Sequence, residues 1–202
     1  MGWFSRKPPP HPHLRELIGL RCCLTAWRRA VIEHWHQDGV ASREELTERL
    51  SQLGWYNTGA GGADPFTEHV LQVPVGDLDP SLLLGAHWRA EAAASIAWAL
   101  GLVDQIPPPS QRSDVAALES LFPLADRSAP AIAQARMRDR AAIAGKLAEW
   151  KQHLSVATAN RETAGPADES AAFAVSRAYE RTRGLAWVLT DVASIDDTVM
   201  DT

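Results

Sequence analysis

The stretch that decides the fold is residues 79–103, DPSLLLGAHWRAEAAASIAWALGLV. Asp79 suits a helix cap and Pro80 the first helical position, and few helix breakers follow before Gly101. Steps of three and four residues place two stripes on this helix: Trp88, Glu91, Ser95, Trp98 and Leu102 on one, and the small residues Ala90, Ala94, Ala97 and Gly101 on the other. We therefore predict a central helix over 80–103, with tryptophans that fill a core and alanines that let other helices approach.

Glu91 is the one charged residue on the tryptophan stripe of this helix. A buried carboxylate is costly unless it is paired with a positive charge. We therefore expect an arginine from another part of the chain to pair with Glu91.

The length and composition of the chain restrict its class. At 202 residues, one domain is expected, and the net charge of −5 lacks the basic footprint of a nucleic-acid binder. No apolar run reaches the ~18 residues of a membrane span, and the first residues lack the apolar core of a signal peptide. The adjacent Cys22 and Cys23 favour reduced thiols over a structural disulfide. We therefore predict a cytoplasmic protein that spans no membrane and binds no nucleic acid.

The rest of the chain predicts an all-α fold, a single-domain helical bundle. The expected segments are a flexible tail over 1–13, helices over 14–37, 43–53, 113–121, 129–157 and 168–193, and a frayed acidic end over 194–202. One short extended segment is an alternative at Val70, Leu71, Val73 and Val75, where no pairing partner is evident. We expect a domain over 14–193, with the central helix between the two long helices that follow it.

Two pairs of short motifs carry a family resemblance. Trp88-Arg89-Ala90-Glu91 precedes Ala97-Trp98-Ala99-Leu100-Gly101, and Tyr179-Glu180-Arg181 precedes Gly184-Leu185-Ala186-Trp187. These segments resemble the signature segments of the bacterial domain of unknown function 4272 family, from whose pattern Gly184 and Ala186 depart. The resemblance covers residues 14–192. It implies the fold and a bacterial, cytoplasmic origin, and it implies no reaction.

A cluster of Glu, Arg and Trp side chains is the sharpest candidate site. Its members are Trp88, Arg89, Glu91, Trp98, Arg136, Glu180, Arg181, Arg183 and Trp187. Two helices that each present Glu beside Trp could place both carboxylates in one cavity, for acid–base chemistry or for an anion held by the arginines. The alternative is a buried ion-pair network that fixes helix packing. We favour the structural interpretation, because such networks also occur wherever charge enters a helical core.

Other catalytic or metal-binding patterns are weak. The segment from Glu33 to His36 contains one Glu-x-x-His unit, but the second copy that a di-iron bundle requires is missing. Neither cysteine lies in a nucleophile signature, and there is no Gly-x-Ser-x-Gly elbow. We therefore predict no metal, no cofactor and no catalytic residue.

Two functions follow from this sequence as hypotheses. The first is a non-catalytic protein-interaction module (an adaptor, a regulator or an immunity-type protein), suggested by the acidic charge and by the aromatic residues Trp35, Trp55 and Tyr56. Its partner is expected to be another protein. The alternative is an enzyme or small-anion binder that uses the Glu/Arg cluster.

Overall fold

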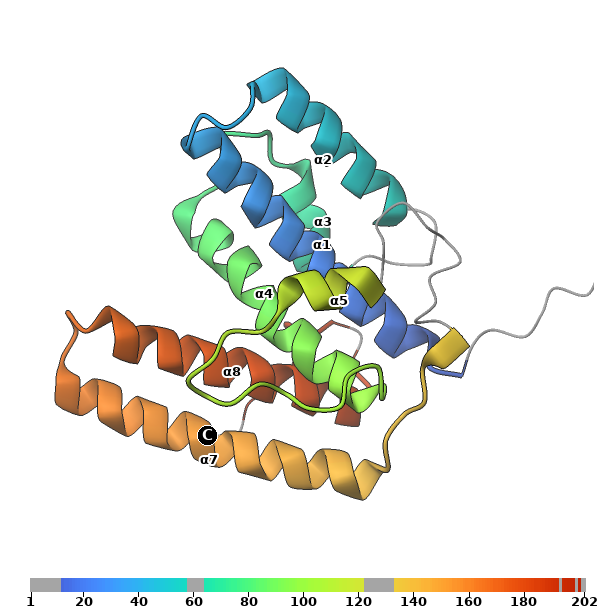
Figure 1. Cartoon of the computed structure of the whole chain (residues 1–202), viewed down its shortest axis with the longest axis vertical. Helices are drawn as coiled ribbons and strands as arrows, with labels where there is room; N and C mark the ends of the chain where they lie inside the picture. Colours follow the sequence, from blue (N-terminus) through green and yellow to red (C-terminus); the bar gives the residue numbers. More distant parts are fainter. Residues whose placement is uncertain (1–11, 58–63, 122–132, 193, 199, 201–202) are drawn as a thin grey trace, which may run out of the picture.

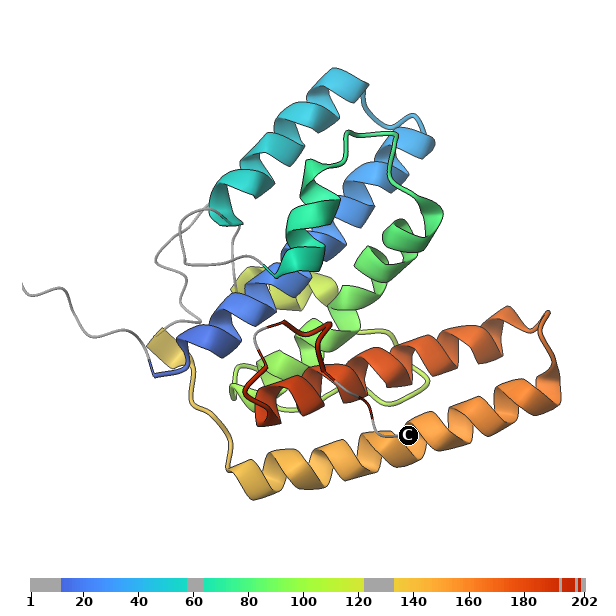
Figure 2. The same cartoon turned by 180° about the vertical axis from the view of Figure 1, so that it is seen from behind.

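The structure, a computed structural model, describes residues 12–57, 64–121, 133–192, 194–198 and 200 (Figures 1 and 2). Within these residues, seven helices pack together and no strand occurs. The helices are α1 (Leu14–Gln37), α2 (Arg43–Asn57), α3 (Pro65–Gln72), α4 (Pro80–Ala99), α5 (Val115–Leu121), α7 (Arg140–Ala164) and α8 (Glu169–Leu189). The predicted all-α class is confirmed. Most of the predicted N-terminal tail, residues 1–11, lies outside the described residues.

Helix α4 is the centre of the arrangement, but the prediction that it lies between the two long helices that follow it is wrong: only the second of these, α8, packs directly along it, and α1 takes the place expected for α7. Helix α4 packs against α1 on one side and α8 on the other, and α7 pairs with α8 as an antiparallel hairpin (Figure 1). Every residue from Trp88 to Leu100 is buried. A helix that is apolar all round belongs in a core, which explains why the Trp stripe and the Ala stripe are both covered.

The main core joins α1, α4, α7 and α8. Its largest contributors include Leu20, Leu24, Ile96, Leu100, Ile143, Trp150, Leu185 and Trp187. Gly184 lets α8 approach α4 closely, because a Cβ atom at this position would lie 2.8 Å from the carbonyl oxygen of Ala92. The small side chains of α4 are therefore used at the contact with α8.

The helix beginnings follow the sequence signals. The Asp79 carboxylate accepts a hydrogen bond from the Ser81 N–H at 2.8 Å, which caps α4. Ser42 and Glu45 form the reciprocal capping box at the start of α2, with Ser42 N donating to Glu45 Oε2 at 2.9 Å. Asp168 caps α8 by accepting from the Ala171 N–H.

The predicted helix over 129–157 is wrong at both ends. The backbone N–H groups of Arg136 and Arg138 donate to the carbonyls of Leu100 and Ala99, each at 2.8 Å, so this segment caps the end of α4 and α7 begins only at Arg140. At its other end, α7 continues past the predicted end at 157 to Ala164. It ends where Gly165 adopts φ 88°, a backbone conformation that favours glycine.

Other boundaries also differ from the sequence-based expectation. Helix α2 continues through Gly54 to Asn57 rather than ending at 53, and α8 ends at Leu189 rather than at 193. Helix α4 ends at Ala99 rather than near 103, since Gly101 takes φ 67°.

The alternative of an extended segment is not realised at Val70 and Leu71, which lie in α3. Asp64 caps this helix, and Val70 is fully buried in a cluster shared with α1 and α4, so helical burial replaces strand pairing.

Candidate functional site

The predicted Glu/Arg cluster is divided between two ion-pair networks, each of which joins α4 and α8. Glu91 pairs with Arg181 in the first network, and Arg89 lies with Glu180 and Arg183 in the second. Arg136 belongs to neither group of contacts: it is exposed, and its guanidinium donates to the carbonyls of Ala133 and Ala135.

The first network surrounds the Glu91 carboxylate, which is only 3% exposed. Its Oε2 atom accepts hydrogen bonds from Arg181 Nε at 2.9 Å and from Ser113 Oγ at 2.6 Å. Its Oε1 atom accepts from the Ser113 N–H at 3.2 Å and lies 4.0 Å from Arg177 Nε. The expected arginine partner of Glu91 is thus found, and both carboxylate oxygens are occupied by the protein itself.

Arg181 extends this network to the loop that follows α4, which contains Pro107, Pro108 and Pro109 and is here called the proline-rich loop. Arg181 is fully buried, and it donates to the carbonyls of Pro107 and Gln111, each at 2.7 Å. Its guanidinium lies 4.8 Å from the ring centre of Trp150 on α7. Burial, opposed by Glu91, lowers the pKa of Arg181. One guanidinium therefore ties α4, α7, α8 and the proline-rich loop together, which is the arrangement expected of a structural ion pair.

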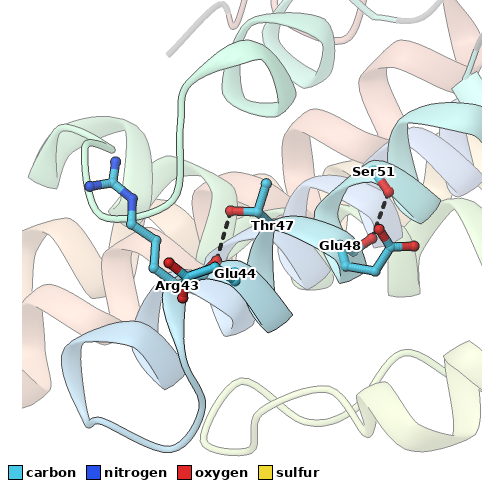
Figure 3. A pocket seen from close by; sticks show the side chains of 5 residues that line it. All are labelled: Arg43, Glu44, Thr47, Glu48 and Ser51. Carbon is cyan, nitrogen blue, oxygen red and sulfur yellow. Dashed lines mark hydrogen bonds between the residues drawn. The ribbon is translucent and has the colours of Figure 1, made fainter.

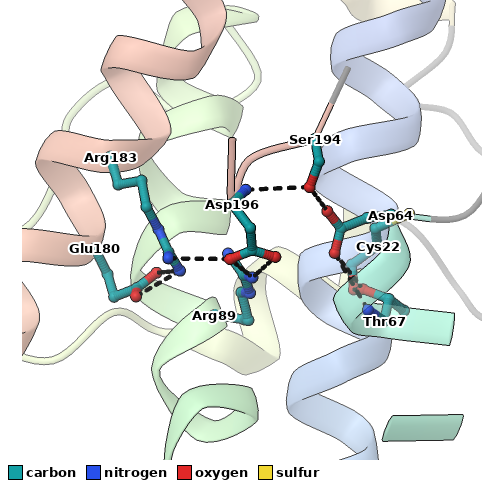
Figure 4. Close-up of polar contacts among 8 residues, drawn as sticks. All are labelled: Cys22, Asp64, Thr67, Arg89, Glu180, Arg183, Ser194 and Asp196. Carbon is teal, nitrogen blue, oxygen red and sulfur yellow. Dashed lines mark hydrogen bonds and ion pairs between the residues drawn. The ribbon is translucent and has the colours of Figure 1, made fainter. Parts of the chain in front are cut away.

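The second network lies nearer the protein surface than the first, since it includes the partly exposed Asp196. Figure 4 shows its residues. Arg89 is 1% exposed, and its Nη2 atom donates to both carboxylate oxygens of Asp196, at 2.5 and 2.6 Å. Arg183 Nη1 donates to the same carboxylate at 3.1 Å. Arg183 Nη2 donates to both oxygens of Glu180, at 2.6 and 2.7 Å. Asp196, whose side chain is 37% exposed, thus closes a network otherwise built by α4 and α8.

Residues 194–198, here called the C-terminal strap, hold Asp196 in place. Ser194 Oγ donates to the carboxylate of Asp64, which also caps α3 by accepting from the Thr67 N–H (Figure 4). Ile195 is buried in the main core. The predicted frayed acidic end is wrong over residues 194–198, because the buried Ile195 side chain and the polar contacts of Ser194 and Asp196 hold this segment in place. No local pattern in the sequence indicates these contacts, since their partners lie more than 100 residues away.

The predicted tryptophans lie at different places around the two networks. Trp88 contacts Phe173 with ring centres 5.8 Å apart, and the Arg138 guanidinium lies 4.8 Å from the ring centre of Trp98. The ring of Trp187 lies beneath Arg15, whose guanidinium is 4.1 Å away. All three tryptophans are buried, so they act as core and stacking residues around the charges.

The two cysteines are free and buried on α1, as the sequence predicted. Burial raises the pKa of the Cys22 thiol to about 11 and that of Cys23 further. A thiolate is the reactive form, so both groups are poor nucleophiles near neutral pH.

The described part of the chain contains no cluster with the geometry of a metal site. No group of three or more His, Cys, Asp or Glu side chains lies close enough there to hold a metal ion. The same described residues include no helix both long and apolar enough to cross a membrane.

A shallow hollow lies on α2 (Figure 3). Its lining residues are Arg43, Glu44, Thr47, Glu48 and Ser51, all exposed and all on one helix. The hydroxyls of Thr47 and Ser51 donate to carbonyls of their own helix, each at 2.7 Å. Because no second element completes the hollow, we treat it as a solvated helix face.

These features define an all-α protein whose central helix is held by two Glu/Arg networks. The family described as domain of unknown function (DUF4272) matches residues 78–198, more than half of the chain. The chain belongs to this family. The match includes α4, α8 and the C-terminal strap. It begins at residue 78, whereas the motifs led us to expect a resemblance from residue 14 onward. No curated protein and no solved structure matches the chain.

Proposed function

We propose that the chain is a non-catalytic protein-interaction module whose contact surface is the outer side of the α7–α8 hairpin. The observation that carries this proposal is the exposure of α7. Of its 25 residues, only Ile143 and Trp150 are buried. The closed end of the hairpin extends past the other helices in both views (Figures 1 and 2).

The character of the hairpin surface supports a protein partner. Val156 and Tyr179 are two of the six large hydrophobic residues that are exposed in the described chain; a third, Phe173, also contacts Trp88 of α4. The exposed small residues of α7 are Ala141, Ala142, Ala144, Gly145, Ala148, Ala159 and Ala164. Short side chains allow a second helix to pack at a small interaxial distance. The partner we propose is therefore a protein that presents an amphipathic helix.

The alternative, an enzyme or small-anion binder at the Glu/Arg cluster, has less support at Glu91. Acid–base catalysis requires that a carboxylate reach a substrate proton. The Glu91 oxygens are bonded to Arg181 and Ser113 behind the proline-rich loop. This arrangement favours a structural role for Glu91.

Of the three aromatic residues first considered for binding, Trp35 is the one whose side chain is described. Trp35 is half-buried against α2, with the Arg49 guanidinium 5.3 Å from its ring centre. The side chains of Trp55 and Tyr56 lie outside the described residues. A cytoplasmic location stays a prediction.

The proposal is tested by crosslinking followed by reconstitution. A photoreactive amino acid replaces Ala148 on α7 or, as a control, Glu48 on α2, both of which are exposed. The protein captured specifically at position 148 is identified, purified and titrated against the wild type, Ala148→Arg and Glu48→Arg. We expect Ala148→Arg to weaken the Kd about tenfold or more, because a long charged side chain at the interface centre prevents close packing.

The control variant shows which results would contradict the proposal. Glu48→Arg should bind like the wild type, and both variants should keep the wild-type Tm. Equal binding by the two variants, or equal capture at positions 48 and 148, would rule out the hairpin as the contact surface.

A further inference from the structure

We propose that Arg89 and Arg183 form a binding site for a phosphate-type oxyanion, and that the chain's own Asp196 carboxylate occupies this site as an internal ligand. We call it the Arg89–Arg183 site. It involves α4, α8 and the strap, and it goes beyond the interaction surface proposed above, next to which it lies: the Arg183 guanidinium is 5.5 Å from the ring centre of Tyr179.

The first argument is that the site holds more donors than its occupant can use. Arg89 contacts Asp196 through Nη2 alone, although guanidinium groups prefer to bind carboxylates through two nitrogens. Arg89 Nε, Arg89 Nη1 and Arg183 Nε are buried without a hydrogen-bond partner among the described residues. A tetrahedral oxyanion carries four oxygens instead of two, so it matches these surplus donors better than a carboxylate does.

The second argument is that the donors are fixed before any ligand arrives. The Arg89 guanidinium lies 4.5 Å from the ring centre of Phe66, which holds its plane. Glu180 binds Arg183 through both carboxylate oxygens. Asp196, in contrast, comes from the strap rather than from a helix, and its side chain is 37% exposed (Figure 4). Release of Asp196 therefore requires movement of the strap, including Ser194 and Ile195, whereas the two arginines keep their contacts with Phe66 and Glu180.

The third argument is the charge that Asp196 leaves behind. Burial opposes the charged form of Arg89, but the neighbouring Cys23, Glu180 and Asp196 together outweigh burial and raise the pKa of Arg89, so the guanidinium stays charged. When Asp196 is withdrawn, two arginines face one glutamate, and Arg89 loses the carboxylate to which it donates its hydrogen bonds. Since a buried charge with incomplete pairing is unfavourable, the open state of the strap favours an incoming anion.

The experiment titrates inorganic phosphate at constant ionic strength, balanced with chloride, and follows the assigned Arg89 Nε–Hε signal by NMR. The variants are Asp196→Asn, which keeps the size of the side chain, and Asp77→Asn, a matched control in which an exposed aspartate that pairs with Arg43 is neutralised. Asp196→Asn should bind phosphate at least about tenfold more tightly than the wild type, because a tethered competitor acts at an effective concentration in the millimolar range. Asp77→Asn should behave like the wild type.

Three results would overturn the proposal. The Arg89 signal could fail to move in Asp196→Asn, Asp77→Asn could gain the same affinity, or acetate could bind as tightly as phosphate, which would contradict the tetrahedral assignment. If Asp196→Asn does not fold, the wild type is compared with Arg183→Gln. The proposal then requires a saturable shift in the wild type that Arg183→Gln abolishes.

Discussion

Glu91 shows how a single side chain can determine the packing of several elements. It lies on α4, and its oxygens are bonded to Arg181 on α8 and to Ser113 at the end of the proline-rich loop. Any change that neutralises Glu91 leaves the fully buried Arg181 guanidinium without its counterion. The cost of such a change is dominated by the partner that remains.

We therefore predict that Glu91→Gln lowers the free energy of unfolding by about 3–5 kcal/mol. Urea denaturation at pH 7 measures this loss. Glu149→Gln is the control, since Glu149 forms an exposed pair with Lys146 on α7 and should change stability by less than about 1 kcal/mol. A loss of similar size in both variants would contradict a structural role specific to Glu91.

At the scale of the elements, the distance between α4 and α8 is set by a glycine. A Cβ atom at Gly184 would lie 2.8 Å from a backbone oxygen of Ala92, and backbone cannot move aside as a flexible side chain can. Gly145 on α7 serves as the control position, because a Cβ atom there would meet nothing within 4 Å.

The two glycines should respond in opposite directions to the same substitution. Gly184→Ala should destabilise the protein by about 1–3 kcal/mol, because the helices must separate. Gly145→Ala should stabilise it by about 0.5–1 kcal/mol, because alanine loses less backbone entropy in a helix. Thermal unfolding of both variants under identical conditions measures the difference. A Gly184→Ala variant as stable as Gly145→Ala would show that the contact adapts without strain.

The sequence predicted the helices best where the signal is local. The bounds of α1 and the cap of α4 agree with the structure, because periodicity and capping residues act within a few positions. The start of α7 was predicted wrongly, since Arg136 and Arg138 use their backbone N–H groups on the end of α4, far away in sequence. Asp196 was missed as a site residue for the same reason.

At the scale of the whole molecule, the region matched by the family depends on a helix outside it. The match begins at residue 78, whereas Leu20, Cys23 and Leu24 of α1 belong to the main core with α4. Without α1, one side of α4 would be exposed to water, at a cost of about 25 cal/mol per Å² of apolar surface.

We therefore predict that a fragment of residues 78–198 does not fold cooperatively, whereas a fragment of residues 12–198 does. Circular dichroism melting curves distinguish the two outcomes. A sharp transition in the shorter fragment, at the Tm of the longer one, would show that α1 is dispensable.

The strap also bears on how fast the chain reaches its fold. Its contact with Arg89 spans 107 positions, that of Ser194 with Asp64 spans 130, and the nearby bond from Arg15 to Val192 spans 177. Such separations slow folding, whereas the neighbouring helices of the α7–α8 hairpin meet early. The strap therefore closes late, and until it does, the part of the main core that Ile195 covers stays exposed and prone to aggregation.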